Sequence, residues 1–145
     1  MSVTSVMRVP ADRFIAAFAA HLKNEGTIKV PNFANFVKTG CSRKNAPACA
    51  DWFYIKAASV MRHFYVSGTT PLGVSTLAGK YSHPASGRST PHHTRDASRK
   101  VIRSIVQQFA GQNLLLTRDG EARHISPNGR KMVEEFANSL LERKD

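Results

Sequence analysis

The sequence has 145 residues and 41% hydrophobic side chains, which fits one packed domain over residues 1–145 and excludes a disordered chain. Lys and Arg number 21 against 10 Asp and Glu, and the net charge of +11 indicates a polyanionic partner, usually nucleic acid. No run of about 18 apolar residues and no secretion signal occur, so we expect a soluble intracellular protein. An anionic membrane surface would call for a basic amphipathic helix with exposed large apolar residues, and none stands out.

The positive charge is concentrated in the middle of the chain. Residues 41–125 hold 12 Lys and Arg against 4 acids, whereas residues 1–40 hold 5 against 2 and residues 126–145 hold 4 against 4. This asymmetry predicts a localised binding face. The alternative is a basic surface that is solvated uniformly.

A first helix is predicted over residues 10–25, because its large apolar residues share one face: Phe14, Phe18 and Leu22. Pro10 suits its first turn, and Gly26 suits the position just beyond its end. A short helical stretch over residues 32–38 should follow, and then a loop over residues 40–50 that is rich in Gly, Pro, Ser and Asn.

A long helix is predicted over residues 52–66, with Asp51 as its N-cap. One broad apolar face must be buried in the core, and it comprises Phe53, Tyr54, Ala57, Val60, Met61, Phe64 and Tyr65. The opposite side carries Trp52, Lys56, Ser59, Arg62 and His63. We interpret this second set as part of a binding face.

Residues 67–94 are rich in Gly, Ser, Thr, Pro and His, and we predict one long basic loop there. The loop contains Lys80 and Arg88 and no acidic residue. Its many free backbone N–H groups suit contacts with phosphate, and its His92 and His93 are candidates for RNA contact.

A helix over residues 96–110 is predicted to bury the stripe Val101, Ile102, Ile105, Val106 and Phe109. Two strands, residues 114–117 and 123–125, should form a hairpin around Asp119-Gly120, a strong turn signal. Ser126-Pro127 then begins a last helix, with Ser126 as its cap. The predicted fold class is mainly α: a winged-helix-like helical domain with a small β-hairpin.

Three groups of residues carry the binding hypothesis, because Arg and Lys recognise phosphate and aromatic rings stack on splayed bases. The first is Trp52, Lys56, Arg62 and His63; the second is Arg95, Arg99, Lys100 and Arg103; the third is Arg118 and Arg123, which flank the hairpin. The alternatives are a rim or core position for Trp52 and a plain solvated face for the cations.

Enzymatic chemistry has little support in the sequence. His92-His93 with Asp96 could supply a base and its orienting carboxylate, but no nucleophile motif or phosphate-binding glycine signature accompanies them. Cys41 and Cys49 lack metal-ligand spacing, which leaves a shared zinc site as a remote alternative. We therefore expect no catalytic residue, metal, cofactor or small-molecule substrate.

The segment Trp52–Ser59, read as WFYIKAAS, resembles the WFYxRAAS signature of the e-type ribosomal protein S nineteen family of eukaryotes and archaea. Val30-Pro31, Val37–Gly40 and Ser126–Arg130 resemble further motifs of that family, in the same order and at family spacing. Together they cover essentially the whole chain. Lys56 stands where the signature usually has Arg, so a bidentate phosphate contact becomes a point charge.

This resemblance implies a structural protein in the head of the small ribosomal subunit, bound to small-subunit ribosomal RNA and to neighbouring head proteins. It implies a role in precursor RNA maturation and subunit assembly, and a cytoplasmic location with nucleolar or nuclear transit in a eukaryote. The RNA-facing residues it implies are Trp52, Lys56, Ser59, Arg62, Arg99 and Arg103. The main alternative is a winged-helix DNA-binding regulator, which the bare order of elements fits equally well.

Overall fold

The computed structural model describes residues 5–85, 89, 91–117 and 122–143, which fold into a mainly α-helical domain. The α-helices are α1 (Ser5–Arg8), α2 (Ala11–Glu25), α3 (Trp52–Ser67), α4 (Val74–Lys80), α5 (Arg99–Gly111) and α6 (Pro127–Glu142), with one 3-10 helix, η1 (Asn32–Asn35). Strand β1 (His83–Pro84) pairs antiparallel with β2 (Thr94–Arg95), and β3 (Leu115–Thr117) pairs with β4 (Arg123–Ile125). The predicted class, mainly α with a small hairpin, is confirmed. The winged-helix outline stays a prediction.

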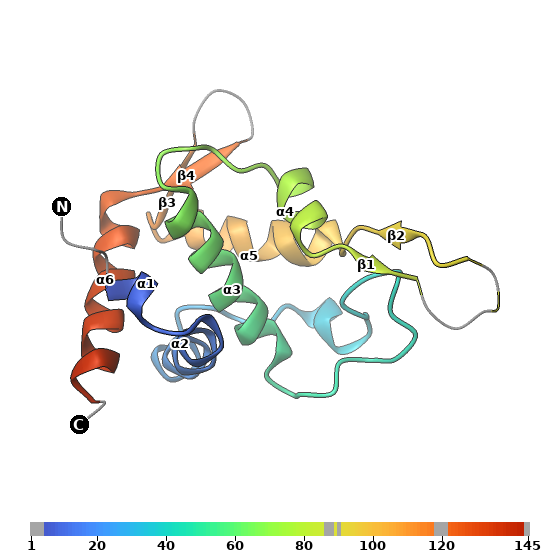
Figure 1. Cartoon of the computed structure of the whole chain (residues 1–145), viewed down its shortest axis with the longest axis horizontal. Coiled ribbons are helices and arrows are strands. Elements are labelled where there is room, and N and C mark those ends of the chain that lie inside the picture. The colour runs from blue at the N-terminus through green and yellow to red at the C-terminus, as the bar shows by residue number, and fades with distance from the viewer. Residues whose placement is uncertain (1–4, 86–88, 90, 118–121, 144–145) are drawn as a thin grey trace.

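Helix α3 runs through the middle of the molecule (Figure 1). Helices α2 and α6 lie on one side of it, α4 lies on the other, and α5 passes behind. The predicted apolar face of α3 is buried, except that Tyr54 is only half-buried, and Ala58 from outside that face is buried as well. Helix α3 also contacts α5 and β4, two further elements that carry candidate binding residues.

The helix boundaries follow local signals that the sequence carries. Gly26 ends α2 in the left-handed conformation, with φ of 67°, which glycine adopts without strain. Ser126 caps α6 as predicted, since its Oγ accepts a hydrogen bond of 3.0 Å from the N–H of Gly129. Asp51 occupies the N-cap position of α3 but makes no capping bond with its side chain, because its carboxylate accepts from Lys23 Nζ at 2.9 Å.

The prediction of one irregular loop over residues 67–94 is wrong in part. Helix α4 lies inside this segment, and β1 follows it. Gly, Ser and Thr are weak helix formers, so the local sequence does not predict α4. Burial of Leu77 and Ala78 against the core holds it in place, which is a tertiary effect.

Two further expectations have mixed outcomes. Helix α5 begins at Arg99, three residues later than expected, with Ser98 at its N-cap. The predicted hairpin is present. Leu72 extends it on the side of β4, where it forms an antiparallel bridge with Arg123 through two backbone hydrogen bonds of 2.8 and 3.2 Å. The turn predicted at Asp119-Gly120 lies outside the described residues. None of the helices in the described part of the chain is long and apolar enough to cross a membrane.

Replacing Phe64 by Ala should lower the free energy of unfolding by about 3–5 kcal/mol, because a large cavity would remain in the core. Phe64 is 1% exposed. Phe36, at 88% exposure, is the matched control, and Phe36→Ala should change stability by less than about 0.5 kcal/mol. Urea denaturation of the two variants measures the difference. Similar midpoints for both would contradict the placement of Phe64.

Gly129→Ala should also destabilise the protein, because an added Cβ would lie 2.5 Å from the carbonyl oxygen of Leu114. Gly79 is the control, since a Cβ there would meet nothing within 4 Å and Ala favours the helix. Thermal melts should show a lower Tm for Gly129→Ala and an unchanged or slightly higher Tm for Gly79→Ala. A Gly129→Ala variant that melts with the parent would show that α6 and Leu114 are farther apart.

Candidate nucleic-acid interface

The residues predicted on the outer side of α3 form one stripe, but none of them is fully exposed. Trp52, Lys56, Ser59, Arg62 and His63 are all half-buried. Part of this side is covered by Tyr81, which directly follows α4. Sequence reasoning missed Tyr81 because it fell in the segment predicted as a loop; the only available signal was a single aromatic residue among small polar ones.

Tyr81 contacts three members of the stripe. Its hydroxyl lies 2.6 Å from Ser59 Oγ in a hydrogen bond, and Lys56 Nζ lies 3.6 Å from the centre of its ring. The His63 ring meets it edge-on, with centroids 5.3 Å apart. A cation over an aromatic face is favourable, and more so when the cation has lost water. Tyr81 therefore holds Lys56 without the help of a carboxylate.

Burial shifts the ionisation of three residues in and beside the stripe, and neighbouring positive charges add to the shifts of the two cations. Burial, helped by the nearby charge of Arg43, lowers the pKa of Lys56 to about 8. Burial also lowers the pKa of His63, and the charges of Lys80, Arg62 and Lys56 add to this effect. Burial raises the pKa of Tyr81 to about 12, although the hydrogen bond between its hydroxyl and that of Ser59 acts to lower it. A bound anion would relieve the strain on these cations, because an opposite charge favours the protonated form.

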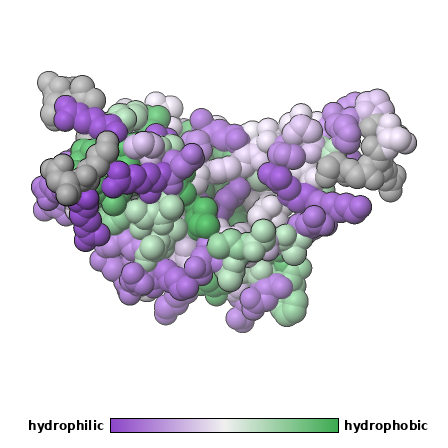
Figure 2. Space-filling model, turned by 60° about the horizontal axis from the view of Figure 1, so that its bottom comes forward, coloured by the Kyte–Doolittle hydropathy of each residue, from purple (hydrophilic) through white to green (hydrophobic). Residues whose placement is uncertain are grey.

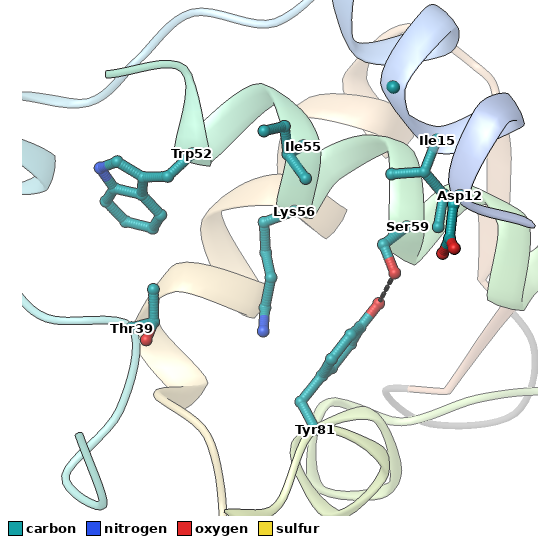
Figure 3. A pocket seen from close by; sticks show the side chains of 9 residues that line it. Asp12, Ile15, Thr39, Trp52, Ile55, Lys56, Ser59 and Tyr81 are labelled. Atoms are coloured by element: carbon teal, nitrogen blue, oxygen red, sulfur yellow. Dashed lines mark hydrogen bonds between the residues drawn. The ribbon is translucent and has the colours of Figure 1, made fainter. Parts of the chain in front are cut away.

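An apolar groove of about 500 Å³ opens beside the stripe, between α2 and α3 (Figure 3). Its lining includes Asp12, Ile15, Ala16, Thr39, Trp52, Ile55, Lys56, Ser59 and Tyr81. The indole of Trp52 stands at one end and the ring of Tyr81 at the other, and the side chain of Lys56 extends between them. Trp52 packs against the core and also lines this open groove, and its role in stacking on a base stays a prediction.

The second predicted group lies at the start of α5 and just before it. Arg95, Arg99, Lys100 and Arg103 are all exposed. Asp96 Oδ2 lies 3.9 Å from Arg99 Nη2, and Lys100 Nζ lies 4.6 Å from the ring centre of Phe33. Thr39 connects the start of α5 with the first group. Its carbonyl accepts a hydrogen bond of 3.1 Å from the N–H of Ser98, and Thr39 also lines the groove beside the first group.

The third group joins the second at another groove, of about 290 Å³, which Arg103, Gln107, Thr117 and Arg123 help to line. Arg123 is half-buried, and its Nε and Nη1 are shielded from solvent with no hydrogen-bond partner among the described residues. Arg62 Nε is likewise shielded from solvent and has no hydrogen-bond partner among the described residues. Unsatisfied charged donors cost free energy in the isolated protein, and a phosphate that draws them outward would recover part of it. Arg118 lies outside the described residues.

The remaining predicted residues lie around β1 and β2. Lys80 is exposed at the end of α4, and His92 and His93 are exposed near β2. The ring of His92 hydrogen-bonds the carbonyl of Ala85, and the carbonyl of His93 accepts from Ala85 N–H at 3.0 Å. Arg88 lies outside the described residues. In the part of the chain that is described, no group of three His, Cys, Asp or Glu could hold a metal ion, and both cysteines are free.

Helix α6 provides an internal contrast for these cations. Arg130 pairs with Glu134 at 3.5 Å and Lys131 pairs with Glu135 at 3.9 Å, both within the helix. Among the described residues, none of the ion pairs involves Lys56, Arg62, Lys100 or Arg103.

Figure 2 brings the bottom of the view in Figure 1 forward and shows apolar residues gathered among hydrophilic ones on that face. Charge without acidic partners and accessible apolar surface together suit a nucleic acid.

Comparison with known proteins gives a consistent result. The model of the family described as ribosomal protein S19e matches residues 5–143. The small ribosomal subunit protein eS19A of Schizosaccharomyces pombe is 37% identical over 142 residues, which cover 98% of this chain and 97% of that protein. The small ribosomal subunit protein eS19 of Aeropyrum pernix is 35% identical over 141 residues, covering 97% and 92%, and that of Mya arenaria is 30% identical over 140 residues, covering 97% and 93%.

The desolvated Lys56 should make the stability of the protein depend on pH. In the folded protein its pKa is about 8 against an ordinary 10.5, so the unfolded chain binds more protons between these values. The free energy of unfolding should therefore rise from pH 8 to 9.5, by at most about 1.4 kcal/mol per pH unit. Lys56→Met should flatten this rise. Lys44→Met, at an exposed lysine, should retain it, and equal slopes in the parent and Lys56→Met would refute the burial of the ammonium group.

Proposed function

The chain belongs to the ribosomal protein S19e family, and from this we propose that it is a structural component of the small ribosomal subunit that binds small-subunit ribosomal RNA. Ribosomal proteins of this family are structural rather than enzymatic, and they act as parts of the ribosome. The finer parts of the proposal are a position in the head of the subunit, neighbouring head proteins as partners, and a role in maturation of the RNA precursor and in assembly. Passage through the nucleus or nucleolus would follow in a eukaryote.

The observation that carries the RNA contact is the set of cations without acidic partners. Lys56, Arg62 and Arg123 lose water in the isolated protein, and none of them forms an ion pair among the described residues. Phosphate supplies the missing charge and releases counterions as it binds. We assign the contact to these three and to the other predicted residues that the structure describes: Trp52, Ser59, His63, Lys80, His92, His93, Arg95, Arg99, Lys100 and Arg103. Arg88 and Arg118 stay in the proposal on the strength of the sequence alone.

The DNA-regulator alternative loses ground for two reasons. The family and its named relatives are ribosomal, and the similarity extends over nearly the whole chain. The stripe on α3 also combines a half-buried aromatic residue with partly desolvated cations, which suits the unstacked bases and irregular backbone of folded RNA better than a regular duplex.

Arg103→Gln tests the RNA contact, and Lys131→Gln removes the same charge from the ion-paired face of α6. Filter binding to small-subunit ribosomal RNA at several salt concentrations should show weaker binding for Arg103→Gln, with a salt slope smaller by about 0.7–1. Lys131→Gln should bind with the slope of the parent. In cell lysates fractionated on sucrose gradients, the parent should migrate with small subunits through a high-salt wash. Equal slopes for the two variants would remove Arg103 from the interface, and a parent found only at the top of the gradient would sink the ribosomal proposal.

A further inference from the structure

The groove between α2 and α3 has a composition that phosphate binding alone does not explain. Its walls are largely apolar, formed by Ile15, Ala16 and Ile55 together with the two aromatic rings at its ends. Ile55 is a large hydrophobic residue that remains exposed in the isolated protein. Apolar walls give no free energy to a phosphate oxygen, whereas they stabilise a flat aromatic ligand that leaves water.

The polar groups of the groove are few and stand at different places. Lys56 Nζ lies near the Tyr81 end, the paired hydroxyls of Ser59 and Tyr81 lie beside it, and the carboxylate of Asp12 lies on the α2 side. A ligand that fits all of them has an apolar face, a polar edge with donors and acceptors, and an attached anion. A nucleotide has these three parts, and about 500 Å³ falls in the usual range for sites that hold one small ligand.

We propose that the groove between Trp52 and Tyr81 receives a single unstacked base of the bound RNA, with Lys56 contacting the phosphate of the same nucleotide. This inference rests on the proposed function, since the base arrives as part of the RNA. Trp52 supplies a stacking surface, and the hydroxyl pair and Asp12 face the hydrogen-bonding edge of the base. The positive charges that act on Lys56 and on the neighbouring His63, from Arg43, Arg62 and Lys80, favour an anionic ligand over an apolar segment of a protein.

Trp52 is the sole tryptophan of the chain, so its fluorescence reports on the groove directly. The full-length protein should be titrated with a short single-stranded RNA of mixed sequence and with an abasic strand of the same length and charge. Stacking of a base on the indole should quench the fluorescence with the RNA, while the abasic strand should bind without comparable quenching. Equal quenching by both strands, or RNA binding with no quenching, would overturn the base site.

A matched pair of substitutions on α2 tests the same inference without changing Trp52. Ala16 lines the groove and Ala20, one turn later, does not, and both are exposed. Ala16→Phe should fill the groove and weaken binding of the mixed-sequence RNA by about tenfold, in the range of one lost base stack, while binding of the abasic strand stays unchanged. Ala20→Phe should behave as the parent, and matching denaturation midpoints would show that both variants fold.

The possible failures are distinguishable. If the parent does not bind small-subunit ribosomal RNA, the proposed function fails and the base site falls with it. If Ala16→Phe binds RNA as the parent does and enters small subunits normally, only the base site fails. If Ala16→Phe binds free RNA normally but is excluded from small subunits, the groove holds a protein side chain, and the base site is overturned as well.

Discussion

The burial of α3 is the constraint on which the other features depend. A helix that is covered on several sides must be apolar over most of its circumference, and α3 buries two alanines, two phenylalanines, a valine, a methionine and a tyrosine. Only one stripe is left for polar groups, and that stripe is itself half-buried. Charged residues placed there are held in defined positions, because their neighbours are core elements rather than loops. The cost is that these charges are separated from part of their water before any partner arrives.

Packing against α3 also explains which elements the sequence reveals. Helices α2, α3 and α6 each carry large apolar residues at helical spacing together with a start or stop signal, and their predicted positions are confirmed. Helix α4 has only Leu77 and Ala78 in the core, within a segment of Gly, Ser and Thr. Its helical conformation is a consequence of the burial of those two side chains, so the local sequence pattern does not predict it. The delayed start of α5 has a similar origin, because Gly40 pairs with Ala97 and keeps that residue extended.

In the candidate site, too, the local sequence predicts some features and tertiary packing decides the others. Residue types and helical spacing were sufficient to place Lys56, Arg62 and the cations of α5 on the correct sides of their helices, and the structure adds how far each is exposed. They could not reveal that Tyr81 lies over Lys56, since these residues belong to elements whose contact is set by α4. The pKa of Lys56 and the groove beside it depend on that contact. Tertiary neighbours therefore decide the chemistry of the site, although the sequence decides its charge.

The lysine at position 56 illustrates why that distinction matters. The signature that the sequence resembles usually has arginine there, and a planar guanidinium could share its charge between two phosphate oxygens. An ammonium is a compact point charge that fits above the Tyr81 ring, and burial lowers its pKa to about 8. In the isolated protein this burial opposes the charged form of Lys56 and so lowers stability, although the contact with the Tyr81 ring favours that form. A phosphate beside the ammonium would raise the pKa again, because an opposite charge stabilises the protonated form. Under the proposed function, part of the free energy of RNA binding would come from relief of this unfavourable state, which would couple the stability of the domain to RNA binding.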